Sequence, residues 1–65
     1  MNHPTPERSG FYYSLGVAYY ALGQFESAIE GFDEAVRINQ KYSEAYHKRG
    51  NVYHDLGQNV RAIED

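Results

Sequence analysis

The feature that most restricts the fold of this chain is an internal repeat with a period of 34 residues. When residues 9–31 are placed over residues 43–65, no gap is needed, and ten of the 23 aligned positions are identical. Average composition would produce about one or two identities. The chain is therefore predicted to contain a duplicated supersecondary unit, with one complete copy and a second copy that stops part-way.

Each unit has the pattern of two helices joined by a short turn. Ser9 and Ser43 are predicted N-caps, because a serine hydroxyl can accept a hydrogen bond from a first-turn amide. Apolar residues recur at helical spacing before Gly23, and a second helix is predicted at about residues 25–38. Gly23 and Gly57 are predicted left-handed C-caps. Because the turn at Gly23 is so short, the two helices are expected to pack antiparallel.

A glycine also recurs inside the first helix of each unit, at Gly16 and Gly50. An internal glycine costs a helix about 1 kcal/mol relative to alanine. Its return at the same place predicts a position where a side chain would not fit. With Ala28 or Ala62 on the facing helix, the two backbones are expected to approach closely.

Length and composition exclude several classes of protein. Sixty-five residues can form at most one small folded unit, and the absence of cysteine removes disulfides and thiolate metal sites. A net charge of −3 opposes binding to nucleic acid or to an anionic membrane. No apolar run approaches the roughly 20 residues that span a bilayer, and no signal-peptide pattern is present. A cytoplasmic protein is expected.

These residues resemble the tetratricopeptide repeat, whose signature is an aromatic residue, then Leu-Gly, Tyr, Ala, Phe and Pro. The first unit supplies Tyr12, Leu15, Gly16, Tyr19, Ala28, Phe32 and Ala35, and the second supplies Tyr46, Gly50, Tyr53 and Ala62. The resemblance implies that these are the residues that pack the repeats. It also implies an all-α fold of antiparallel helix-turn-helix repeats, with about four helices and the last one short, as a fragment of an α-solenoid.

The predicted organisation is a tail at residues 1–8, a first repeat at residues 9–42 and an incomplete second repeat at residues 43–65. The tail holds both prolines and no apolar periodicity, which predicts a mobile segment. Two residues depart from the family pattern. Gln40 stands where the family carries proline, and Arg49 stands where it carries leucine.

The joint between the two repeats leaves two alternatives. Neither glycine nor proline occurs from Phe32 to Arg49, so nothing in the sequence compels a turn at residues 39–42. A normal turn is favoured, with Asn39 as a left-handed C-cap and Ser43 as the next N-cap. In the alternative, the second and third helices fuse into one rod, and a second copy supplies the lost contacts by domain swapping.

Catalysis and metal binding have little support in the sequence. The repeat brings no nucleophile, base and orienting group together, and no glycine-rich phosphate loop is present, so no catalytic or cofactor-binding residue is assigned. His47, Asn51 and His54 share a helical face at i, i+4 and i+7. Two imidazoles about two turns apart are separated by roughly 10.5 Å along the axis, too far to share one ion easily. A polar groove face is favoured over a metal site.

The resemblance implies a role for the first helix of each unit. In tetratricopeptide arrays these helices line a concave groove that binds an extended peptide or a helix. The residues implied here are Tyr13, Val17, Tyr20 and Ala21 in the first unit and His47, Asn51, His54 and Asp55 in the second. The expected function is a non-catalytic protein-interaction module whose partner is another protein or a peptide.

A self-assembling element that forms a homo-oligomer is the alternative function. Solenoid units cannot bury their apolar faces alone, and about three are needed for stability. This sequence stops before the counterparts of Phe32 and Ala35, which leaves open an incomplete array or an obligate oligomer. The first helix is apolar nearly all round, so a second side is expected to be covered at Tyr13, Val17 and Tyr20.

Overall fold

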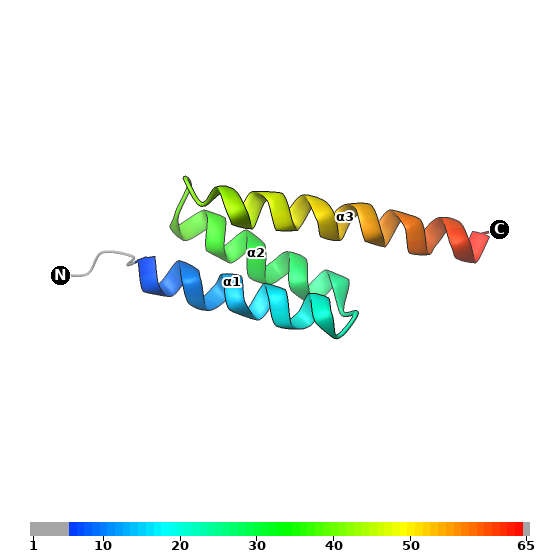
Figure 1. The fold of residues 1–65 in the computed structure, drawn as a ribbon, viewed down its shortest axis with the longest axis horizontal. Helices are drawn as coiled ribbons and strands as arrows, with labels where there is room; N and C mark the ends of the chain where they lie inside the picture. Colours follow the sequence, from blue (N-terminus) through cyan, green and yellow to red (C-terminus); the bar gives the residue numbers. More distant parts are fainter. Residues whose placement is uncertain (1–5, 65) are drawn as a thin grey trace.

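The computed structural model describes the backbone of residues 6–64 and the side chains of residues 8–61. Within these residues the chain forms three α-helices, α1 (Pro6–Ala21), α2 (Phe25–Ile38) and α3 (Ser43–Glu64). α2 lies between α1 and α3 and runs antiparallel to both (Figure 1). The molecule measures 52 × 19 × 13 Å, so the helices lie side by side in one layer. The predicted all-α antiparallel fold is confirmed.

None of the helices in residues 6–64 combines the length and the apolar character that crossing a membrane requires.

α1 ends at the glycine that the sequence predicts as its left-handed C-cap. Gly23 has a φ of +79°. Its amide donates to the carbonyl of Tyr20 at 3.0 Å, and the amide of Gln24 donates to the carbonyl of Tyr19 at 2.9 Å. These two bonds form a Schellman motif, which satisfies carbonyls that the helix end would otherwise leave free. The chain therefore reverses direction within three residues.

α1 begins earlier than predicted. Its first residue is Pro6, whose fixed φ and missing amide suit the first turn of a helix. Ser9 lies inside α1 with 1 % of its surface exposed, so it is not the N-cap. The tail predicted at residues 1–8 overlaps this first turn, and residues 1–5 lie outside the described residues.

The joint between α2 and α3 is a turn, so the fused rod is wrong. Asn39 ends α2 in an extended conformation (φ −126°, ψ 97°), not in the expected left-handed one. Its side-chain Oδ1 accepts a hydrogen bond from the amide of Lys41 at 3.1 Å. Its carbonyl accepts one from the amide of Tyr42 at 3.1 Å. An Asx turn combined with a β-turn thus ends the helix without glycine or proline.

The expected fourth helix is a wrong prediction for the described residues. α3 runs through Gly57 to Glu64, and within residues 6–64 the only positive φ belongs to Gly23. Two residues after Gly23 lies Phe25, which packs on Tyr20 of α1 with ring centroids 5.7 Å apart, whereas Asn59 holds the equivalent place after Gly57. The backbone keeps its helical conformation through Gly57, and α3 extends past the α1–α2 turn (Figure 1).

The core lies on both sides of α2. Its buried apolar residues are Ala28, Phe32, Ala35 and Val36 of α2 and Ala45 and Val52 of α3. The described tyrosines of α1 pack against this core while remaining partly exposed. α2 is thus the central helix, because both neighbours bury their contacts on it.

α1 and α2 approach most closely at two glycines. A Cβ placed on Gly16 would lie 2.6–2.8 Å from the ring of Phe32. A Cβ placed on Gly31 would lie 2.9–3.1 Å from backbone atoms of Gly16 and Tyr12. The close approach expected at Gly16 is present, although Gly31 and Phe32, and not Ala28, supply the nearest atoms. A larger side chain at either glycine would separate the helices.

The substitution Gly31→Ala tests this contact. We expect it to lower the free energy of unfolding by about 1–3 kcal/mol, because the added methyl meets backbone atoms that cannot turn aside. Gly50→Ala adds the same methyl to α3, where nothing lies within 4 Å, and is expected to stabilise the chain by up to about 1 kcal/mol. Urea unfolding followed by circular dichroism compares the two, and equal effects would contradict the close approach.

The geometry of the α2–α3 turn predicts that proline substitutions at two neighbouring positions have opposite effects on stability. Gln40→Pro should raise stability by about 0.4–1 kcal/mol, because proline suits the second position of this turn and narrows the unfolded ensemble. Asn39 before it is already extended, as the residue before a proline prefers. Lys41→Pro removes the amide that donates to Oδ1 of Asn39, and it should therefore lower the stability of the fold. Thermal unfolding measures both, and the same sign for both variants would refute the turn geometry.

Candidate functional site

The residues implied for the groove lie on α1 and α3, the two outer helices of the layer. Those of α1 are Tyr13 and Tyr20, both half-buried, with Val17 and Ala21 exposed, and those of α3 are His47, Asn51 and His54, all exposed, with Asp55 half-buried. Val17 is 38 % exposed. The residues of α1 thus form an apolar strip, and those of α3 form a polar strip. Two side-chain contacts connect the two strips.

The first contact joins Tyr13 of α1 to the start of α3. The Tyr13 ring stacks on Tyr42 with centroids 5.2 Å apart and planes 30° apart, and it lies tilted against Phe32 at 5.7 Å. Burial raises the pKa of the Tyr42 phenol, and the charges of Tyr13 and Glu44 add to the shift. Tyr13 is therefore held by the chain's own residues, and only part of its ring remains open.

The second contact joins Tyr20 of α1 to the middle of α3. The Tyr20 hydroxyl donates a hydrogen bond to Oδ2 of Asp55, and its ring packs on Phe25. This hydrogen bond raises the pKa of the Tyr20 phenol, and desolvation and the charge of Asp55 act in the same direction. Tyr20 is fixed at both its ring and its hydroxyl.

Tyr42 is the residue that sequence reasoning missed at this site. The sequence places it only in the turn between the units. In the structure it is half-buried and forms one end of the apolar strip through its stack on Tyr13. The available signal was an aromatic residue directly before a helix start, where its ring can reach back over the preceding helices.

The polar strip of α3 offers hydrogen-bonding groups. Nε2 of His54 lies 3.5 Å from the side-chain nitrogen of Gln58, and Asn51 and His47 lie about one and two turns earlier on the helix. These amides and imidazoles can both donate and accept. Among the described residues, no three His, Cys, Asp or Glu side chains gather in a way that could hold a metal ion. The imidazoles and the amide thus give the strip hydrogen-bonding groups along two turns of α3.

The residues predicted to pack the repeats differ between the two units. In the first unit Gly16, Ala28, Phe32 and Ala35 are buried, and Tyr12, Leu15 and Tyr19 are half-buried. In the second, Tyr46 is 43 % exposed, Tyr53 is 54 % exposed, and a Cβ placed on Gly50 would meet nothing from another helix within 4 Å. Among the described residues no helix covers these positions of α3, so the packing role expected of them stays a prediction. The side chain of Ala62 lies outside the described residues.

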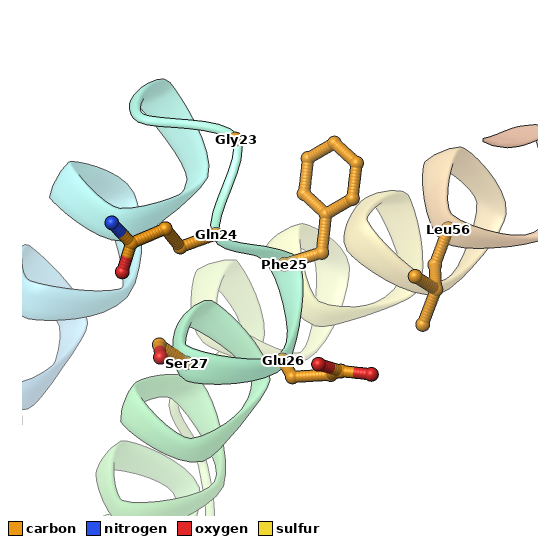
Figure 2. A pocket seen from close by; sticks show the side chains of 6 residues that line it. All are labelled: Gly23, Gln24, Phe25, Glu26, Ser27 and Leu56. Carbon is orange, nitrogen blue, oxygen red and sulfur yellow. The ribbon is translucent and has the colours of Figure 1, made fainter.

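An open hollow of about 350 Å³ lies at the α1–α2 turn. Figure 2 shows that its lining comes from the turn and the first residues of α2, Gly23, Gln24, Phe25, Glu26 and Ser27, and from Leu56 of α3. This lining holds one carboxylate and neither an imidazole nor a thiol. It therefore offers no acid and base pair for catalysis.

Comparison with known proteins gives one family and one relative. A family model described as TPR repeat matches residues 16–57. Protein FlbA of Caulobacter vibrioides is 33 % identical over 61 residues, which cover 94 % of this chain and 10 % of FlbA. The chain thus spans about a tenth of the length of this relative. No solved structure matches the chain.

The Tyr20–Asp55 contact predicts a pH dependence of stability. Because folding raises the pKa of the phenol, its contribution is present below the ordinary pKa of 10.0 and is lost as the pH rises through the higher pKa of the folded chain. We expect Tyr20→Phe to be less stable than the parent at neutral pH and to lose less stability in alkaline solution. Tyr53→Phe, on another face of α3, is the control. Parallel pH profiles for the parent and Tyr20→Phe would disprove the coupling.

Proposed function

The chain belongs to the tetratricopeptide repeat family, and on this premise we propose that it binds an extended peptide or a helix of another protein between α1 and α3. TPR repeats are typically non-catalytic modules of protein–protein interaction. We assign the repeats to residues 9–42 and 43–65, the second incomplete. The binding residues in this proposal are Tyr13, Val17, Tyr20, His47, Asn51 and His54.

The observation that carries the proposal is the exposed Val17 between two fixed tyrosines. Tyr42 holds the ring of Tyr13, and Asp55 holds the hydroxyl of Tyr20. Side chains that are already ordered lose little further entropy when a partner binds. Tyrosines also suit such a site, because they combine a large apolar area with a polar hydroxyl.

The polar strip of α3 supports the same function from the other side. A bound segment that places apolar side chains on α1 still has backbone amides and carbonyls to satisfy. Asn51 can donate to a carbonyl and accept from an amide, and His47 and His54 add further hydrogen-bonding groups one turn to either side. An apolar wall with an opposite polar wall suits an extended peptide.

A matched pair of substitutions tests the groove. Peptides selected on the folded chain from a random display library are measured by fluorescence anisotropy. Val17→Glu places a charge at the centre of the apolar strip and should weaken binding by about tenfold or more. Val60→Glu makes the same change at a valine of α3 that is 47 % exposed, outside the groove, and should leave the affinity unchanged. Equal loss in both variants, or no enriched peptide, would contradict the proposal.

A homo-oligomer is the second candidate, and the outer face of α1 favours it. Phe11, Leu15, Ala18 and Leu22 recur with alternating spacings of four and three residues, the pattern of a two-helix seam. Phe11 is 60 % exposed and Leu22 is 69 % exposed. Pairing this face with that of a second copy would bury it without a domain swap. Light scattering over a concentration series decides between the candidates, because a monomer throughout rules out self-assembly.

A further inference from the structure

A carboxylate lies at each end of the groove between α1 and α3. At one end Oδ2 of Asp55 accepts the hydrogen bond of the Tyr20 hydroxyl, and its Oδ1 has no hydrogen-bond partner among the described residues. At the other end Glu44 is exposed in the first turn of α3. It precedes His47 by three residues and therefore shares the helical face of the polar strip. Both carboxylates can thus receive a further charged or polar partner.

Tyrosine rings accompany both carboxylates. Beside Glu44, Tyr13 and Tyr42 stack with centroids 5.2 Å apart. Burial and the charge of Tyr13 raise the pKa of the Tyr42 phenol, and the charge of Glu44 raises it further, so this carboxylate acts directly on the stacked pair. Beside Asp55 lies the half-buried Tyr20. A ring next to a carboxylate suits a lysine or arginine side chain, because the ring face attracts a cation and the carboxylate pairs with it.

The groove has no cation of its own. The residues implied for it include the carboxylate of Asp55 and neither lysine nor arginine. Two arginines of the chain are held by carboxylates of α2, Arg37 by Glu34 and Arg49 by Asp33, each at 2.6 Å. The whole chain carries a net charge of −3. Charge complementarity therefore favours a basic partner over an acidic one.

The spacing of the two ends sets the spacing of the charges that a partner needs. Tyr13 and Tyr20 are seven positions apart on α1, about 10.5 Å along its axis. Glu44 and Asp55 are eleven positions apart on α3, about 16.5 Å. An extended chain rises about 3.3 Å per residue, so these lengths correspond to about three and five residues.

Given the peptide-binding function proposed above, on which this step rests, we propose that the partner is a basic, extended segment of another protein with two lysine or arginine residues three to five positions apart. One cation lies against the stacked tyrosines beside Glu44, and the other lies against Tyr20 beside Asp55. An apolar side chain between them contacts Val17. A folded second copy does not supply this pair, because Lys41 is the only cation outside the helices of the described chain.

Selection from the random display library tests the charge of the partner. The enriched peptides should carry lysine or arginine pairs at this spacing. The tightest one is compared with a neutral form, in which glutamine replaces every lysine and arginine, by anisotropy at pH 7.5, where an ordinary imidazole carries little charge. The neutral form should bind about tenfold more weakly. Equal binding of the two forms, or enrichment of acidic peptides, would overturn the basic partner.

Substitutions in the chain locate the two cation sites. Glu44→Gln and Asp55→Asn should each weaken binding of the basic peptide about twofold to fivefold and leave binding of the neutral form unchanged. Asparagine at position 55 keeps an oxygen that accepts from the Tyr20 hydroxyl. Glu30→Gln is the control, because it removes the same charge from an exposed position of α2 outside the groove. Equal losses in all three variants would reveal only a general attraction to the net charge and would refute both sites. Circular dichroism checks that each variant keeps its helices.

The neutral peptide separates the basic partner from the groove itself. Val17→Glu should weaken the neutral form, because it disturbs the apolar contact. If the two forms bind equally and both respond to Val17→Glu, the groove stands and the basic partner is wrong. If neither form responds, the peptide binds elsewhere and both proposals are wrong. Self-association of the chain that the peptide reverses, seen by light scattering, would assign the groove to a second copy.

Discussion

The crossing of α1 and α2 at Gly16 and Gly31 is the contact on which the remaining structure depends. With no side chain on either glycine, the two backbones come so close that the Phe32 ring lies directly against α1. This places α2 in the middle of the layer, where the buried Ala45 and Val52 of α3 pack against it. The positions of the apolar and polar strips follow, because α1 and α3 are located mainly by their separate contacts with α2.

A single layer of helices leaves faces uncovered, and this links the fold to its proposed functions. Each outer helix has α2 on one side only (Figure 1). Apolar side chains that a closed bundle would bury, including Phe11, Leu22 and Tyr53, therefore remain more than half exposed. The contacts of Tyr13 with Tyr42 and of Tyr20 with Asp55 fix part of this surface before any partner arrives. Ordered, exposed side chains of this kind lose little further entropy when a partner binds.

Gly23 and Gly57 show how far a shared motif determines structure. Both follow a leucine and precede a glutamine at equivalent places of the repeat. Gly23 adopts a positive φ, whereas α3 passes through Gly57 without a break. The difference lies beyond the motif, because Phe25 packs on Tyr20 and the helix after it buries Ala28 and Phe32, whereas Asn59 stands at the place of Phe25 in the second unit. Glycine permits a left-handed turn, but packing of the following helix stabilises it.

The sequence by itself determined the repeat, the bounds of α2, the C-cap at Gly23 and the all-α class, because these depend on spacing, composition and local hydrogen bonds. It indicated that Gly16 needs a close neighbour, but did not identify Gly31 and Phe32 as that neighbour. The tertiary structure decided which glycine turns the chain, that Asn39 ends α2 through its side chain, and that Tyr42 and Asp55 hold the two tyrosines. These outcomes depend on which side chains meet across helices. Periodicity along one helix states which residues share a face, and only packing determines what that face contacts.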